Sequence, residues 1–240
     1  MKRIVLMVLR NLVSIPYIWI RLCYHANHVE RYTDEEHYEM LTNIVKRANK
    51  GGRVTIQVTG QENIPKDRGF IFYPNHQGLY DVLAVIDVCP VPFSVMAKQE
   101  VKNIPFLKQV FACMKAHMLD RNDVRQGMKI IQAVTEEVRQ GRNYLIFAEG
   151  SRSKDGNKVQ EFKGGSFKAA TKARCPIIPV ALIDAFKPFD RSSAKPVTVQ
   201  VHFLEPILYE EYKEMKTLEI AKLVRERIEQ MILKNTTSCY

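Results

Sequence analysis

Short apolar runs alternate along the chain with longer segments that carry an apolar residue at every third or fourth position. The first pattern predicts buried strands and the second predicts helices. We expect strands at residues 53–59, 69–73, 93–97, 143–147, 177–182 and 197–204. We expect helices at residues 34–49, 79–88, 104–114, 124–140, 167–174 and 217–234. Because strands alternate with helices, the pattern predicts an α/β fold with a central, mainly parallel β-sheet flanked by helices.

Local signals define the ends of two of these helices. Thr33, followed three residues later by Glu36, has the capping-box pattern, and Gly51-Gly52 ends the helix that it opens. Asp123 is a candidate N-cap for the most clearly amphipathic segment, which Gly141 ends.

The N-terminal segment, residues 1–22, is apolar apart from a narrow polar stripe. At about 100° per residue the stripe falls on one line of a helix. Its members are Arg3, Arg10, Ser14 and Arg21. We expect this segment to lie in a membrane interface, with Tyr17 and Trp19 at the headgroups and the arginines on lipid phosphates. Pro16 should kink the helix or divide it in two. A signal peptide and a helix packed on the rest of the chain remain as alternatives.

The charge balance indicates an anionic partner. Lys and Arg number 36 against 26 Asp and Glu, for a net charge of +10. A phosphate ligand, an anionic lipid, an acidic protein or a nucleic acid would each fit that charge. The basic residues are scattered with no aromatic-rich basic stripe, which argues against nucleic acid. His25, His28 and His37 are too loosely grouped to predict a metal site.

A histidine follows the second predicted strand. If that strand ends at Pro74, His76 lies at its carboxyl end, where open α/β sheets bind ligands. Gly78 lets the chain fold back and bring Asp81 towards one imidazole nitrogen, which leaves the other nitrogen as a general base. The alternative is a structural turn in which Asp81 only caps the following helix.

Basic residues follow other predicted strands. Lys98, Arg121 and Arg152 come after strand ends, and Lys163 precedes Gly164-Gly165. Backbone amides of such a glycine pair, with a helix N-terminus behind them, favour an anion. The glycine spacings fit neither a Walker loop nor a dinucleotide-binding motif, and there is no G-x-S-x-G elbow.

Four sequence blocks carry a resemblance to a known family. They are Asn75-His76-x4-Asp81, Leu119-Asp120-Arg121, Phe147 to Ser153, and Ile178-Pro179-Val180. In this order and at these separations they resemble the motif blocks of the glycerolipid acyltransferases, above all the branch that acylates 1-acylglycerol 3-phosphate. Four residues depart from the usual family pattern. Ala148 replaces a proline and Ser151 replaces a threonine. Gly78 replaces a serine, and Gly164 stands where many members have a polar or basic residue.

The resemblance implies a role for each matching residue. His76 would take a proton from the free hydroxyl of a lysophospholipid, and Asp81 would fix its tautomer. The residues implied to bind the glycerol phosphate are Arg121, Glu149, Gly150, Ser151 and Arg152. We add Lys98 and Lys163 to this anion site, and Asn75 and Pro179 support the motifs.

The resemblance also implies the setting of the reaction. Residues 23–240 would form a glycerol-3-phosphate acyltransferase-like domain, with residues 1–22 as its membrane-interface segment. The donor would be acyl-CoA or acyl-acyl-carrier-protein, the acceptor lysophosphatidic acid, and no metal or cofactor is expected. The enzyme would be peripheral or monotopic on the cell membrane, with its active site facing the cytoplasm. The alternatives are an acyltransferase for another lysophospholipid or glycerol phosphate, and a non-catalytic lipid-binding protein.

Overall fold

The computed structural model describes residues 2–120 and 123–237, which form a single seven-stranded sheet in the order β1-β7-β6-β2-β5-β3-β4. The strands are β1 (Val54–Thr59), β2 (Ile71–Pro74), β3 (Ser94–Lys98), β4 (His117–Leu119), β5 (Tyr144–Leu145), β6 (Ile177–Ile183) and β7 (Val197–Phe203). All neighbours are parallel except β6 and β7. The predicted α/β fold with a mainly parallel sheet is confirmed.

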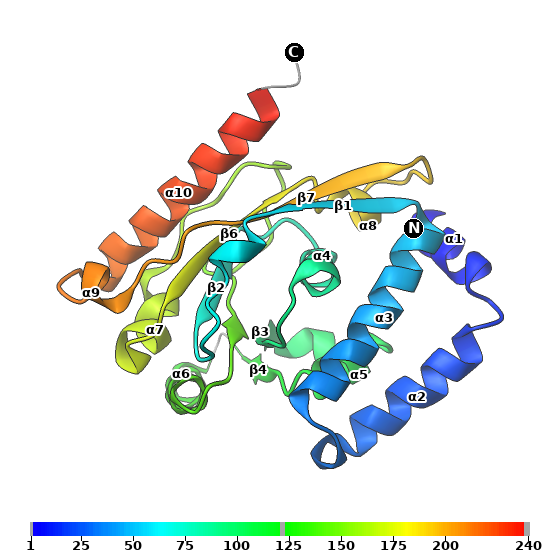
Figure 1. Ribbon diagram of the computed structural model, residues 1–240, viewed down its shortest axis with the longest axis horizontal. Coiled ribbons are helices and arrows are strands. Elements are labelled where there is room, and N and C mark those ends of the chain that lie inside the picture. The colour runs from blue at the N-terminus through cyan, green and yellow to red at the C-terminus, as the bar shows by residue number, and fades with distance from the viewer. Residues whose placement is uncertain (1, 121–122, 238–240) are drawn as a thin grey trace.

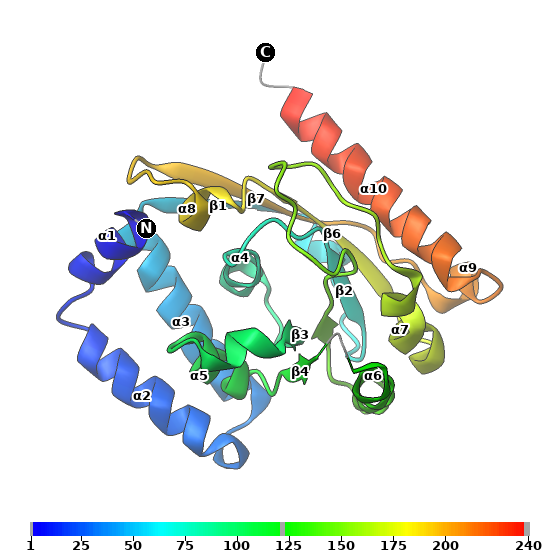
Figure 2. The same ribbon diagram turned by 180° about the vertical axis from the view of Figure 1, so that it is seen from behind.

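Helices cover both faces of the sheet (Figure 1). The helices are α1 (Lys2–Arg10), α2 (Ile15–Asn27), α3 (Asp34–Gly52), α4 (Asp81–Val88), α5 (Leu107–Cys113), α6 (Val124–Arg139), α7 (Lys168–Ala173), α8 (Lys187–Asp190), α9 (Tyr209–Tyr212) and α10 (Thr217–Thr237). Side chains of α3, α4 and α5 pack on one face, and those of α6, α7 and α10 pack on the other. Figure 2 shows the two groups of helices from behind.

Strand β2 is apolar without interruption because both of its faces are buried. Phe72 points into the core beneath α3 and α4, whereas Ile71 and Tyr73 point into the core beneath α6 and α7. Successive side chains of a strand alternate between faces, and a strand covered on both faces needs apolar residues at every position. Because these strands are parallel, the carboxyl ends of β2, β5 and β6 meet at one edge of the sheet.

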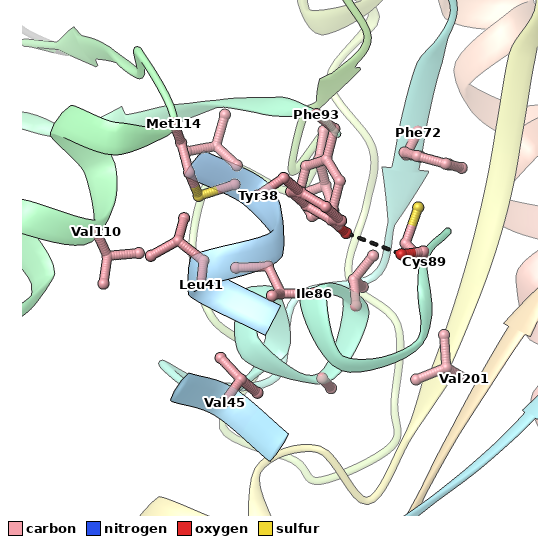
Figure 3. Close-up of a cluster of buried hydrophobic side chains, with 14 of the residues drawn as sticks. Tyr38, Leu41, Val45, Phe72, Ile86, Cys89, Phe93, Val110, Met114 and Val201 are labelled. Atoms are coloured by element: carbon pink, nitrogen blue, oxygen red, sulfur yellow. Dashed lines mark hydrogen bonds between the residues drawn. The ribbon is translucent and has the colours of Figure 1, made fainter. Parts of the chain in front are cut away.

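The core between α3, α4 and α5 contains a buried hydroxyl group. Tyr38 packs edge-on against Phe93, and its hydroxyl donates to the carbonyl oxygen of Cys89 at 3.2 Å (Figure 3). That acceptor satisfies a polar group that would otherwise be costly to bury. The bond fixes α3 to the residue that follows α4.

Most differences between the predicted and observed elements are at their ends. The capping box of Thr33 and Glu36 and the N-cap of Asp123 are both present. The helix expected from residue 104 begins at Leu107, after a 3-10 turn at Gln99–Asn103. The single-turn helices α8 and α9 were not predicted, because one turn is too short to show a hydrophobic period.

The N-terminal segment forms two helices bent by 99°, and Pro16 lies in the first turn of the second. In the described part of the chain, no helix alone has the length and composition to cross a membrane, and α1 with α2 pass that test only as a bent pair. The division that Pro16 predicted is therefore present, although the helices separate just before it.

The expected contact of Arg3 with lipid phosphate is wrong. Its side chain is buried, and it donates to the carbonyl oxygens of Gly52 at 2.6 Å and Lys195 at 2.8 Å. Gly52 ends α3, where carbonyl oxygens lack helical partners and attract a cation. Helix α1 is thus packed on the domain, as the alternative interpretation had it. Exposed apolar side chains remain on the α1–α2 loop and on α2, and they include Val13, Tyr17, Trp19 and Ile20.

A charged network lies at the amino ends of β4 and β5. Glu137 at the end of α6 accepts from His117 at 2.8 Å, from Arg142 at 2.7 Å and from the hydroxyl of Tyr144. Burial alone would raise the pKa of Glu137, but the hydrogen bonds of His117 and Tyr144 outweigh it and lower that pKa to about 2. This network fastens α6 to the sheet at the edge opposite to His76.

Candidate active site

His76 and Asp81 form a hydrogen-bonded pair just beyond the end of β2. The imidazole Nδ1 lies 2.8 Å from Oδ2 of Asp81. Asp81 is the first residue of α4, is fully buried, and also accepts from the backbone amides of Gln77 at 2.6 Å and Gly78 at 3.0 Å. These contacts hold the carboxylate in one orientation beside the imidazole. With Nδ1–H donated to Asp81, the lone pair of His76 is on Nε2, as a general base requires.

Asn75 determines where the chain leaves the sheet. Its Nδ2 donates to the carbonyl oxygen of Leu182 at 3.0 Å, and its Oδ1 accepts from the amide of Leu182 at 2.8 Å. The side chain thereby continues the pairing of β2 with β6 after Pro74, which frees the backbone of His76 to turn away. The imidazole then stacks on Phe147, with ring centroids 4.0 Å apart.

Glu149 and Ser153 hydrogen-bond to the backbone amide and carbonyl groups of His76. Oε1 of Glu149 accepts from the amide of His76 at 2.8 Å, and the amide of Ser153 donates to the carbonyl oxygen of His76 at 2.8 Å. Burial raises the pKa of Glu149, and its second oxygen is buried without a hydrogen-bond partner. The resemblance implied a contact of Glu149 with the glycerol phosphate, whereas here its carboxylate accepts from the backbone of His76.

The loop of Gly150, Ser151 and Arg152 lies beside Lys163. Gly150 has φ +76°, and a Cβ there would lie 3.0 Å from Nζ of Lys163. The amide of Lys163 donates to the carbonyl oxygen of Ala148 at 2.9 Å, which keeps the lysine beside this loop. Ser151 is tied to Gln160 by two hydrogen bonds, and Arg152 is exposed. This loop therefore carries Arg152, lies beside Lys163, and is joined to His76 by the hydrogen bonds of Glu149 and Ser153.

The remaining predicted site residues lie further away or outside the described residues. Arg121 belongs to the latter group. Lys98 is the exposed last residue of β3, one strand beyond β5 along the edge of the sheet. Pro179 is buried in β6 opposite Tyr73, where it supports the strand that Asn75 pairs with. Within residues 2–120 and 123–237, no three His, Cys, Asp or Glu side chains are placed to hold a metal ion.

Sequence reasoning missed Phe147 and Gln77. Phe147 follows β5 and reaches His76 because β5 is the neighbour of β2, which no local pattern indicates. Gln77 is buried and uses both ends of its amide, donating to Leu182 at 3.0 Å and accepting from the amide of Ala185 at 2.8 Å. A glutamine beside the histidine was the only available signal, and an exposed glutamine would have looked the same.

Comparisons with known proteins identify a family for the chain. The model of the acyltransferase family matches residues 55–183. The chain is 31% identical over 179 residues to a 1-acyl-sn-glycerol-3-phosphate acyltransferase of Borreliella burgdorferi, covering 73% of this chain and 70% of that protein. It is 28% identical over 182 residues to the enzyme of the same name from Saccharomyces cerevisiae, covering 72% of this chain and 58% of that protein.

A solved structure shares the fold along almost the whole chain. The crystal structure of the 1-acyl-sn-glycerophosphate (LPA) acyltransferase of Thermotoga maritima superposes with a TM-score of 0.79 at 24% identity, covering 98% of this chain and 96% of that chain. The motif blocks, the matched family and the shared fold agree, and the chain belongs to the acyltransferase family.

Proposed function

We propose that the protein transfers a fatty acyl group from a thioester donor to the sn-2 hydroxyl of 1-acyl-sn-glycerol 3-phosphate, giving phosphatidic acid. The observation that carries this proposal is the 2.8 Å contact between His76 and Asp81, held beside a cationic loop by the bonds of Glu149 and Ser153. A base next to an anion site fits an acceptor that carries its hydroxyl close to a phosphate. The names of the relatives point to the same acceptor.

The reaction follows from the free nitrogen of His76. Nε2 takes the proton of the acceptor hydroxyl while its oxygen attacks the thioester carbonyl, and Asp81 stabilises the resulting imidazolium. When the tetrahedral intermediate collapses, the carbon–sulfur bond breaks and the imidazolium returns its proton to the thiolate. The products are an ester and a free thiol. General base catalysis supplies about 10²–10⁴-fold, so the alignment of both substrates must supply much of the rest.

The phosphate is assigned to the loop beside His76. Arg152 and Lys163 supply charge, and the backbone of Gly150 and the hydroxyl of Ser151 supply further contacts. Arg121 joins them on the strength of the resemblance, and Lys98 extends the site along the sheet edge. Glu149 receives a different role, because a buried carboxylate repels phosphate whereas it can hold the amide of His76.

The setting is a membrane surface. Val13 is 96% exposed, Ile20 68% and Tyr17 66%, and such apolar exposure beside arginines suits the interface of an anionic bilayer. We propose that the protein is peripheral or monotopic, with its active site facing the cytoplasm. The donor, acyl-CoA or acyl-acyl-carrier-protein, would then arrive from the aqueous side.

The decisive experiment is a transfer assay with 1-acyl-sn-glycerol 3-phosphate and each donor in turn. The wild-type protein should form phosphatidic acid, and His76→Ala should lose at least about 10²-fold in kcat while its circular dichroism is unchanged. His28→Ala, a change at a histidine remote from the dyad, is the matched control and should retain full activity. An active His76→Ala variant would refute the mechanism. Turnover only with another lysophospholipid or with glycerol phosphate would refute the acceptor.

A further inference from the structure

A ring of three polar side chains joins the turn at residues 75–81, here called the catalytic turn, to the loop that follows Arg152. Nε2 of Gln77 donates to Oδ1 of Asn157 at 2.8 Å. Nδ2 of Asn157 donates to Oδ1 of Asp184 at 3.1 Å, and the amide of Asp184 donates back to Oδ1 of Asn157 at 2.8 Å. The ring closes because Oε1 of Gln77 accepts from the amide of Ala185, the next residue, at 2.8 Å.

These three residues come from three separate parts of the chain. Gln77 directly follows His76, Asn157 lies in the loop after the anion-site residues, and Asp184 directly follows β6. The Asn157 loop is bonded to the catalytic turn at its other end as well, through the amide of Ser153 and the carbonyl oxygen of His76. The ring is thus the second of two hydrogen-bonded connections between this loop and the turn.

The backbone at Asp184 indicates that the ring is under constraint. Asp184 has φ +63°, a left-handed conformation that non-glycine residues adopt at a cost unless their surroundings hold them there. Here the backbone amide of Asp184 is held by Asn157, and its second carboxylate oxygen accepts from Lys187 at 2.6 Å.

A packed segment supports the ring from the far side. Gly156 leaves room for the ring of Phe186, which would lie 3.5 Å from a Cβ at that position. Gly78 similarly leaves room for Oδ2 of Asp190 at 3.0 Å. The segment 184–190 therefore rests on the loop and on the catalytic turn together, without a side chain at either glycine to separate them.

We propose that Gln77, Asn157 and Asp184 are positioning residues for the acceptor, which set the place of the Gly150–Arg152 loop relative to His76. The proposal rests on the function proposed above and goes beyond it, because none of the three residues touches the reacting atoms. If the ring is broken, the base and its partner Asp81 remain in place. The phosphate contacts then lose their alignment with the hydroxyl, so the effect falls on the KM of the acceptor.

The test uses a reciprocal exchange that leaves the shape of the ring unchanged. Asn157→Asp places a carboxylate against Asp184, and like charges at that distance repel. Adding Asp184→Asn restores a donor, because an amide there can give its hydrogen to the new carboxylate. Asparagine also tolerates the left-handed backbone. Asn63→Ala is the control, because it removes one amide donor, to the carbonyl oxygen of Phe203, outside the ring.

Kinetics with the full-length protein and both substrates should separate the effects. Asn157→Asp is expected to raise the acceptor KM about tenfold, equivalent to about 1.4 kcal/mol, with kcat and the donor KM within about threefold of wild type. The double variant Asn157→Asp/Asp184→Asn should recover most of that loss. Failure of the exchange to recover the acceptor KM, or an equal rise in Asn63→Ala, would overturn the proposal.

Amide hydrogen exchange provides a readout that needs no turnover. Residues 152–158 should exchange faster in Asn157→Asp than in wild type or Asn63→Ala, and the reciprocal exchange should restore their protection. If the wild-type protein transfers no acyl group to 1-acyl-sn-glycerol 3-phosphate, the proposed function fails, and this measurement alone decides on the ring. Unchanged exchange over these residues in Asn157→Asp would refute the positioning role in either case.

Discussion

Gly164 and Gly165 offer a test of how the C-terminal helix α10 supports the proposed anion site at Lys163 and the Gly150–Arg152 loop. A Cβ on Gly164 would lie 3.0 Å from the backbone nitrogen of Leu218 and 3.2 Å from its Cα, at the start of α10. A Cβ on Gly165 would have nothing within 4 Å. The two glycines are adjacent and precede the same helix, so Gly164→Ala and Gly165→Ala form a matched pair.

The magnitude depends on whether α10 can move. The first turns of α10 are anchored by Ile220 and Ala221, both buried against the sheet, so the helix cannot recede without loosening that packing. Overpacking of this kind typically costs about 1–3 kcal/mol. Gly165→Ala, in open space, should instead be neutral or stabilising by up to about 1 kcal/mol, because alanine restricts the unfolded chain.

Thermal unfolding and kinetics together check this reasoning. For a chain of this size 1 kcal/mol corresponds to about 2–4 °C, so Gly164→Ala should lower Tm by about 2–12 °C, whereas Gly165→Ala should leave it unchanged or raise it slightly. Displacement at Gly164 should also move Lys163 away from Gly150 and raise the acceptor KM. Equal Tm values for the two variants would show that α10 yields freely, and the argument would fail.

Four further predictions follow from single contacts. Glu137→Gln should cost about 3 kcal/mol at pH 7, because the pKa of Glu137 is about 2 in place of its ordinary 4.5. The lowered pKa stabilises the fold above pH 4.5 and loses that effect as the pH falls to 2, so urea midpoints of variant and wild type should converge at low pH; a constant gap would contradict this. Arg3→Met should lower the free energy of unfolding by about 2–4 kcal/mol, since two charged hydrogen bonds to carbonyl oxygens are lost. An unchanged urea midpoint would show that these two bonds do not stabilise the fold. Arg152→Lys should raise the acceptor KM about tenfold, because an ammonium replaces a planar fork, and an unchanged KM would remove Arg152 from the phosphate site. Trp19→Ser with Ile20→Ser should release the protein from anionic vesicles in a flotation assay without lowering Tm, and continued flotation would exclude α2 as the contact.

The contact between His76 and Asp81 was predictable because its geometry is local. His76 and Asp81 lie five residues apart on one turn, and their side chains meet there. The expectation that His76 lies at a strand end followed from the apolar run before it. Most of the fold was equally accessible, since two-sided burial of strands such as β2 leaves an uninterrupted apolar signature.

The environment of Arg3 was not predictable in this way. The helical periodicity placed it correctly in a polar stripe, but the same stripe fits phosphate headgroups and buried carbonyl oxygens equally well. Only the packing of α1 on α3 decides between them, and it gives Arg3 the carbonyl oxygens of Gly52 and Lys195. Arginine in an amphipathic segment thus indicates an acceptor without identifying it.

The order of strands in the sheet explains which parts of the site stayed hidden. Glu149 and Ser153 reach His76 because β5 lies beside β2, although more than seventy residues separate the partners in the chain. Family resemblance brought these residues into one site and implied a phosphate contact for Glu149, but a motif does not record which atoms meet. The structure shows that Oε1 of Glu149 accepts the amide of His76. Our proposal therefore leaves the cationic side of the loop to the acceptor. Under the proposed function, the roles follow from adjacency: residues local to the turn supply the base, residues across the sheet hold its backbone, and the exposed side of the same loop binds the phosphate.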